Sequence, residues 1–231
     1  MDFATPLLRW PFARREKRFL LYGTEPDQIA HCANTGSMKG VLEHATHVWV
    51  RDYGAASGRK LRYGAELLEP AGGTLVCINT AHANTLAGEA LTAGLVPGFP
   101  HVHNLQHEVK FSAATRFDWA FATPTQPRVW CEVKNVTMAE GPVALFPDAK
   151  TERGTKHLHT LAQLVQQGGV ALQLYMVARA DCQEFRPAEM IDPTYAAALH
   201  AAHRAGVVVV ALGCQVTPQQ INVCKVLPVV V

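Results

Sequence analysis

The sequence predicts an α/β (α+β) protein of two domains, a small β-barrel followed by a domain built on a mixed sheet. Short strand-like segments with glycine-containing turns fill residues 1–82, whereas helix-like and strand-like segments alternate over residues 83–231. Hydrophobic residues make up 48% of the 231-residue chain, which is enough to bury two cores. We therefore expect a domain boundary between residues 80 and 84.

The N-terminal domain contains several short runs of aromatic and β-branched residues. These runs predict strands at residues 18–23, 47–53, 60–63 and 74–79, and the glycines between them mark turns. Short strands at this spacing are typical of a small barrel, and the size fits the oligonucleotide-binding (OB) type. Other small barrels fit the same pattern.

The C-terminal domain alternates between helical periodicity and apolar strand-like runs. We expect strands at residues 108–111, 116–121, 129–137, 170–178 and 207–212, and a loop over residues 138–150. Helices are expected over residues 85–94 with Asn84 as N-cap, over residues 152–167, and from Asp192-Pro193 to Ala205.

Charge is distributed unevenly along the chain. The formal net charge is only +2, but residues 1–62 hold ten Lys and Arg against six Asp and Glu. Within this part, residues 9–18 mix arginines and a lysine with Trp10 and Phe12, a combination suited to contacting a nucleic-acid backbone and stacking on bases. A solvated N-terminal arm is the alternative. The loop at residues 32–40 offers Lys39 and backbone amides to an anion.

Several classes of protein are disfavoured by composition. The six cysteines are scattered without a CxxC pair, so neither a zinc ribbon nor a disulfide framework is indicated, and we expect a reducing cytoplasm. No signal peptide is evident, and the longest apolar run, at 207–212, is too short to span a bilayer, so we expect no membrane partner. His101, His103 and His107 could suggest zinc, but a surface connection is the commoner reading of such a stretch.

Charged residues recur at the centre of the C-terminal domain. Side chains two apart on a strand share a face, so Glu132 and Lys134 point the same way, while Cys131 and Val133 point into the core. If the strand at 116–121 pairs with the strand at 129–137, Asp118 lies beside this charged face. Two carboxylates and one ammonium can then bind a divalent cation and activate water.

Motifs spread over the whole chain resemble the sugar fermentation stimulation protein (SfsA) family. Proteins of this family are described as an OB-type domain joined to a PD-(D/E)xK nuclease-like domain, with a DNA-binding role in transcription. The motifs appear in the family's order: Asn34-Thr-Gly-Ser-Met-Lys39, Arg59-Lys60, Glu108, Arg116-x-Asp118, Glu132-Val-Lys-Asn-Val-Thr137, Phe146-Pro-Asp-Ala149, Arg153-Gly154, Lys156-His-Leu158 and Ile191-Asp192-Pro193.

The resemblance implies roles for the central charged residues. Asp118 matches the first aspartate of the nuclease motif, Glu132 the second acid and Lys134 the lysine. Asp118 and Glu132 would then bind Mg²⁺ or Mn²⁺ together with the backbone carbonyl of Val133. Lys134 would position the nucleophile or stabilise charge on the phosphate.

Further residues are implied as accessory groups. Glu108 matches an additional upstream acid, a position for which Glu89 competes, and Asp148 could approach the site from its loop. Cations near the start of the helix at 152–167 could hold a phosphate close to the metal. The accessory set is Glu108, Arg116, Asp148, Arg153 and Lys156, and the expected nucleic-acid contacts are Arg14, Arg15, Lys17, Arg18, Lys39, Arg59 and Lys60.

Three functions follow from these patterns. The first is a DNA-binding protein with a divalent-metal-dependent, nuclease-like phosphodiesterase site. The second is a non-catalytic DNA-binding transcriptional regulator of sugar (maltose) metabolism that keeps the nuclease fold. The third is a small-molecule binding protein of a sugar pathway. Intact Asp118, Glu132 and Lys134 favour the first over the second, because a pure binding protein has no need of buried like charges.

Overall fold

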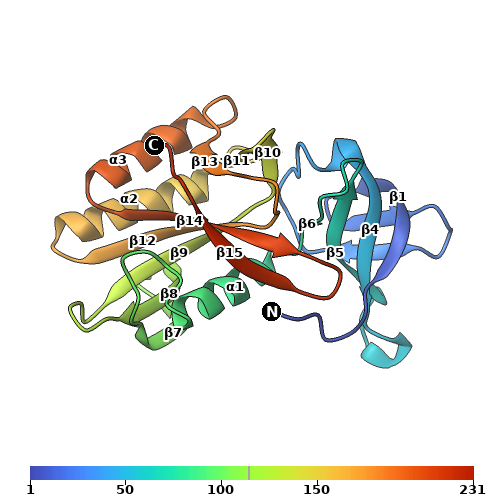
Figure 1. The fold of residues 1–231 in the computed structure, drawn as a ribbon, viewed down its shortest axis with the longest axis horizontal. Helices are drawn as coiled ribbons and strands as arrows, with labels where there is room; N and C mark the ends of the chain where they lie inside the picture. Colours follow the sequence, from blue (N-terminus) through green and yellow to red (C-terminus); the bar gives the residue numbers. More distant parts are fainter. Residues whose placement is uncertain (114) are drawn as a thin grey trace.

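The computed structural model describes residues 1–113 and 115–231, and it confirms the predicted α+β fold. A β-barrel formed by the N-terminal part of the chain stands beside a larger sheet flanked by helices, as Figure 1 shows. Within the described residues no helix is long and apolar enough to cross a membrane.

The N-terminal barrel closes on itself. Its strands follow the order β3-β2-β1-β4-β5-β6, and an additional parallel pairing of β3 with β5 completes the ring. Trp10, Leu21, Val48 and Leu68 are buried in its core. The strands are β1 Leu8–Glu16, β2 Leu20–Gly23, β3 Ile29–Cys32, β4 Ala45–Asp52, β5 Tyr63–Pro70 and β6 Val76–Cys77, with 3₁₀ helices at Leu42–His44 and Ala55–Ser57.

Two expectations for the barrel are corrected. The basic segment is not a solvated arm but strand β1, which pairs with both β2 and β4 and buries Trp10 against Tyr63. The strand expected at residues 60–63 begins only at Tyr63, because residues 58–62 form an exposed connection before β5.

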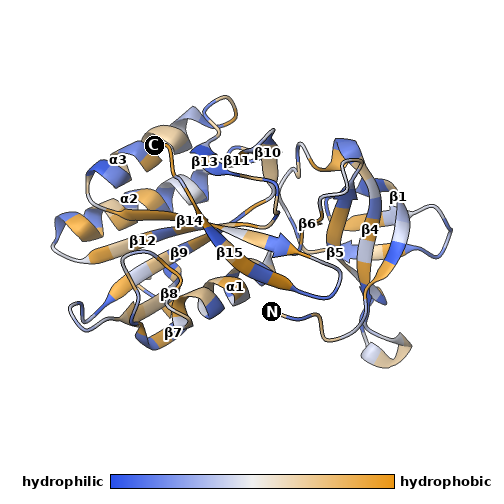
Figure 2. Ribbon diagram, in the orientation of Figure 1, coloured by the Kyte–Doolittle hydropathy of each residue, from blue (hydrophilic) through white to orange (hydrophobic). Residues whose placement is uncertain are grey.

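The C-terminal domain is built on a mixed sheet of order β15-β14-β12-β9-β8-β7. The pairings β9–β12 and β12–β14 are parallel and the others antiparallel. Figure 2 shows the apolar character of β12 and β14, which lie at the centre of the domain. The strands are β7 His103–Lys110, β8 Arg116–Ala122, β9 Val129–Val136, β12 Val170–Val177, β14 Val208–Val216 and β15 Ile221–Leu227.

Helices cover both faces of this sheet. Helix α1 (Ala81–Thr92) packs in one apolar cluster with Cys131 and Val133, whereas α2 (Glu152–Gln166) and α3 (Pro193–Arg204) pack in another around Tyr175. Asp192 caps α3 by accepting a hydrogen bond from the amide of Tyr195 at 3.0 Å, as expected of an Asp-Pro helix start.

Two further expectations are wrong. Helix α1 begins at Ala81, so Asn84 is a residue of its first turn and not an N-cap. Residues 138–150 do not form one loop, because β10 (Met138–Glu140) and β11 (Val143–Phe146) pair there and β11 joins β13 (Glu184–Pro187). Met138 and Leu145 bury against Ala188, a contact that local sequence does not reveal.

Candidate functional site

The site begins where the pairing of β8 with β9 ends. The pairing ends at Trp119 and Cys131, and Asp118 is the residue just before Trp119 on β8. Its Oδ2 accepts a hydrogen bond from the backbone N–H of Val133 at 2.7 Å, and its Oδ1 accepts one from Asn84 Nδ2 at 3.1 Å. A carboxylate therefore takes the backbone donor that the next strand residue would otherwise use.

Glu132 is the most buried charged group of the site, with 3% of its surface exposed. Its Oε1 accepts a hydrogen bond from Lys134 Nζ at 2.6 Å and is also hydrogen-bonded to Nδ1 of His157 on α2. Its Oε2 is buried and has no hydrogen-bond partner among the described residues. Burying a carboxylate oxygen without a partner costs folding free energy. A ligand that bound this oxygen would recover that cost.

The two carboxylates are in different protonation environments. Burial raises the pKa of Asp118, and the negative charge of Glu132 raises it further against the opposing Val133 amide and Lys134. Burial also acts to raise the pKa of Glu132, but Lys134 and His157 outweigh it and hold that pKa below its ordinary value. Glu132 is thus ionised at neutral pH, and a cation bound beside Asp118 would favour the ionised form of that carboxyl against the effect of burial.

These groups fit a hard divalent cation. In an antiparallel ladder the N–H and C=O of one residue face the same neighbour, so the Val133 carbonyl faces the strand of Asp118. Carboxylate and carbonyl oxygens suit Mg²⁺ and Mn²⁺. The part of the chain that the structure describes holds no group of three or more His, Cys, Asp or Glu placed for a metal, so water would complete the coordination, as Mg²⁺ tolerates.

Among the described residues, no third acid joins this pair. Glu108 forms an exposed ion pair with Arg116 at 3.1 Å, and Glu89 pairs with the N-terminal ammonium at 2.9 Å. Neither is among the charges that shift the pKa of Asp118. The histidines at 101, 103 and 107 belong to no such metal group among the described residues either, and His107 packs on Trp119.

A cleft between the two domains opens on Lys134. It has a volume of about 490 Å³, and Arg18 and the loop at 34–36 form its wall on the barrel side. Asp148 lines the same cleft, but its Oδ2 accepts a hydrogen bond from the amide of Met38 at 2.7 Å, so this carboxylate joins the domains. On the side of the mixed sheet the cleft is lined by Asn84, Val133, Lys134, Asn135 and residues 145–151.

The predicted basic contacts of the barrel differ in their surroundings. Arg15 donates hydrogen bonds to backbone carbonyls of the 34–37 loop and of Arg18, so its guanidinium is engaged within the barrel. Arg14 pairs with Glu16 at 2.6 Å. Lys17 and Arg18 form the turn after β1, and both have a positive φ. Arg59, beside Lys60 in the sequence, lies over the ring of Tyr53 at 3.9 Å. Lys39 lines a separate pocket.

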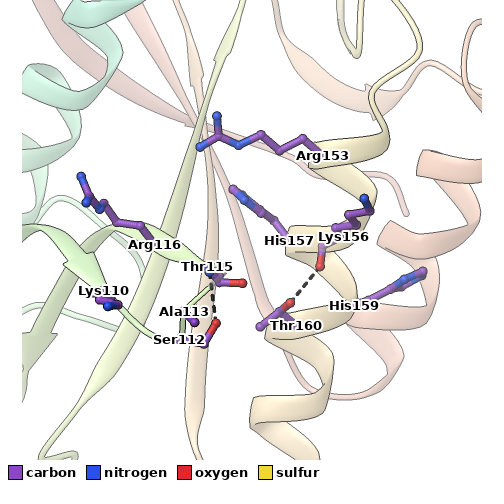
Figure 3. Close-up of a pocket in the computed structure, with 10 residues that line it drawn as sticks. All are labelled: Lys110, Ser112, Ala113, Thr115, Arg116, Arg153, Lys156, His157, His159 and Thr160. Atoms are coloured by element: carbon purple, nitrogen blue, oxygen red, sulfur yellow. Dashed lines mark hydrogen bonds between the residues drawn. The ribbon is translucent and has the colours of Figure 1, made fainter.

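Arg116, Arg153 and Lys156 line a second pocket, shown in Figure 3, in which neither Glu132 nor Lys134 takes part. His157 lines this pocket and also bonds to Glu132. The sequence placed His157 with Arg153 and Lys156 as a cation near a bound phosphate, but it did not predict the contact with Glu132, because helical periodicity alone does not say which face of α2 meets β9.

An OB-type barrel joined to a mixed-sheet domain with two acids and a lysine on adjacent strands defines a class of two-domain α+β proteins. The family models "SfsA N-terminal OB domain" and "Sugar fermentation stimulation protein RE domain" match residues 13–78 and 81–220. The chain therefore belongs to the sugar fermentation stimulation protein (SfsA) family.

Individual relatives agree with this assignment. The sugar fermentation stimulation protein homologs of Rhodospirillum centenum and Maricaulis maris are each 42% identical to this chain. The first match covers 98% of this chain and 98% of the relative, and the second covers 94% of each. A solved structure, "The structure of Pyrococcus Furiosus SfsA in complex with Ca2+", is similar with a TM-score of 0.87 at 24% identity. The match covers 100% of this chain and 98% of the chain in that structure, and it shows that the two proteins share a fold.

Proposed function

We propose that the protein binds nucleic acid, most readily DNA, in the cleft between its domains and hydrolyses phosphodiester bonds with Mg²⁺ or Mn²⁺ at Asp118 and Glu132. The observation that carries this proposal is the buried Oε2 of Glu132, which lacks a partner among the described residues and lies beside a second carboxylate. A protein that only bound DNA would gain stability by replacing this pair with neutral side chains.

The chain's own residues divide the chemistry between them. A divalent cation at this site would lower the pKa of a bound water and neutralise charge on the scissile phosphate. Asp118 is held in place by Val133 and Asn84, and Glu132 by Lys134 and His157, so both carboxylates are oriented before a cation binds. Lys134 lines the cleft, where its ammonium can position the attacking water or stabilise the phosphate oxygens.

The cleft supports a nucleic-acid strand as the ligand. Arg18 lines it from the barrel, and Lys134 and Lys150 line it from the other domain. Cations on both walls suit a chain of phosphates, whose binding releases counterions. All six cysteines are free, which agrees with a reducing compartment, and we propose the cytoplasm as the protein's location.

The test is a cleavage assay on labelled single- and double-stranded DNA and RNA with Mg²⁺, Mn²⁺ or a chelator. Cleavage should require the cation and should be lost in Lys134→Ala, whereas nucleic-acid binding should remain. Lys225→Ala, which removes the same charge from β15, is the matched control and should cleave normally. Failure of the wild type to cleave any of these substrates would exclude the enzymatic function.

A second candidate function, a DNA-binding transcriptional regulator without catalysis, is favoured by one observation. Lys134 and His157 both contact Oε1 of Glu132, so that charge is partly compensated without a cation. Salt-dependent DNA binding by a wild-type protein that cleaves nothing would select this function. Binding that does not weaken as salt is added would exclude both functions.

A further inference from the structure

The pocket of Figure 3 is strongly basic. Lys110 and Arg116 line it from the β7–β8 hairpin, and Arg153 and Lys156 line it from the first turns of α2. In Figure 3 the side chain of Arg153 extends from the helix toward Arg116. The described residues that line the pocket include no Asp or Glu, and among its four cations only Arg116 has an ion-pair partner in the described part of the chain, the exposed Glu108 outside the pocket.

His157 connects this pocket to the candidate catalytic carboxylate. It is buried, with 7% of its surface exposed, and its Nδ1 is bonded to Glu132 Oε1. The other ring nitrogen, Nε2, is therefore the atom left for a ligand in the pocket, and it can donate a hydrogen bond to a phosphate oxygen when both ring nitrogens carry a proton. Since Glu132 does not line the pocket, the imidazole of His157 separates it from the two carboxylates.

The basic pocket is distinct from the cleft that opens on Lys134. The two cavities have no lining residue in common, and they lie on either side of the contacts that Glu132 makes with Lys134 and His157. A strand whose scissile phosphate lay at Lys134 would therefore place a different phosphate here. Two arginines in the wall suit this ligand, because a guanidinium binds phosphate oxygens bidentately.

We propose that the basic pocket binds a phosphate group of the nucleic acid other than the one that is cleaved, and that His157 forms the wall between this phosphate and Glu132. The existence of a cleaved phosphate rests on the proposed function, whereas the binding of a phosphate in the basic pocket does not. A terminal phosphate of a strand and an internal phosphodiester carry the same chemistry, and the experiment distinguishes them.

The first measurement is calorimetric titration with inorganic phosphate in the presence of a chelator, so that no metal takes part. The double variant Arg153→Ala/Lys156→Ala should bind phosphate about tenfold more weakly or worse, since it removes two cations that can donate charge-assisted hydrogen bonds to the phosphate oxygens. The control is Arg186→Ala/Lys225→Ala, which removes the same charges from β13 and β15 and should bind as the wild type does. Equal phosphate affinity in the wild type and the pocket variant would overturn the proposal.

The second measurement compares a single-stranded oligonucleotide with and without a 5′-phosphate, again with chelator. If the pocket variant weakens only the phosphorylated strand, a terminal phosphate occupies the pocket, whereas equal weakening of both assigns it to an internal phosphodiester. If neither strand is weakened, the pocket does not contact nucleic acid and the proposal fails, even if the wild type cleaves DNA. Conversely, a wild type that never cleaves leaves these binding results valid.

The role of His157 is tested by two substitutions. His157→Asn retains a nitrogen donor close to the position of Nδ1, so it should keep Mn²⁺ binding, but it lacks Nε2 and should bind phosphate more weakly. His157→Leu should weaken both. Loss of Mn²⁺ binding in both variants with phosphate affinity unchanged would show that His157 serves Glu132 alone and would refute its place in the pocket.

Discussion

His157 Nδ1 and Lys134 Nζ both bind the same oxygen of Glu132, Oε1, the latter at 2.6 Å. Because both contacts fall on one oxygen, they fix the orientation of the carboxylate and leave Oε2 buried without a partner among the described residues. The asymmetry means that a ligand can bind Oε2 without displacing either neighbour. Glu132 is thus oriented by contacts from its own strand and from α2.

Asp118→Asn should stabilise the protein at neutral pH. The folded state raises the pKa of Asp118 through burial and the charge of Glu132, so ionising Asp118 costs folding free energy. The stability from this group is present below its ordinary pKa and is lost as pH rises through the raised value. The amide removes that loss, and the expected gain is on the order of 1 kcal/mol at pH 7 by urea denaturation.

Hydrogen bonding does not oppose this substitution. The side-chain oxygen of the new asparagine can accept the hydrogen bond from the Val133 amide. Asn84 Oδ1 is buried without a hydrogen-bond partner among the described residues of the wild type. If the side-chain amide of Asn84 rotates by half a turn, the NH₂ group of the new asparagine can donate to this oxygen. The wild type should lose stability relative to the variant as the pH rises from the ordinary pKa of Asp118 through its raised value. Parallel stability curves for the two proteins over this range would contradict the pKa shift.

Divalent cations should stabilise the wild type and not the variants of its carboxylates. A ligand that binds only the folded state raises stability by about 2.7 kcal/mol at one hundred times its dissociation constant. Mn²⁺ or Ca²⁺ should therefore raise the melting temperature of the wild type, and Asp118→Asn and Glu132→Gln should abolish the rise. Glu108→Gln, which changes the exposed partner of Arg116, is the control and should keep it. An equal rise in all four proteins would show that the cation binds elsewhere.

The residues of this site differ in how well their positions could be predicted from the sequence. Asp118, Glu132 and Lys134 could be expected to converge because alternation along a strand and pairing with its neighbour are local rules. The involvement of His157, the exposed ion pair of Glu108 and the internal hydrogen bonds of Arg15 depend on tertiary packing. The strand pair β10–β11 escaped prediction for the same reason, since its burial depends on Ala188 far along the chain.

Gly88→Ala should destabilise the protein although alanine favours helices. A Cβ at Gly88 of α1 would approach the ring of Trp119 to 2.7 Å, too close for a rigid indole to tolerate without moving. Overpacking of this kind costs about 1–3 kcal/mol, which exceeds the gain of up to about 1 kcal/mol from helix propensity.

The control for this prediction is Gly72→Ala, where an added Cβ meets nothing within 4 Å. Its unfolding free energy should match that of the wild type. Because Trp119 is the neighbour of Asp118 on β8, Gly88→Ala should also weaken Mn²⁺ binding. A Gly88→Ala protein as stable as the wild type would mean that Trp119 can move freely beside α1.

Arg15→Ala should destabilise the barrel much more than Arg14→Ala. The Arg15 guanidinium donates to the carbonyls of Arg18 at 2.8 Å and Asn34 at 2.6 Å, and also to those of Gly36 and Ser37. Charge-assisted hydrogen bonds contribute about 1.5–3 kcal/mol each, so losing this set should cost at least about 2 kcal/mol. Arg14 pairs with Glu16 and lies over the ring of Tyr22 at 4.1 Å, and because these contacts are exposed to solvent they contribute little to stability. Urea denaturation of both variants, with hydrogen exchange of residues 34–37, measures the difference; if the two variants lose equal stability, the 34–37 loop does not depend on Arg15.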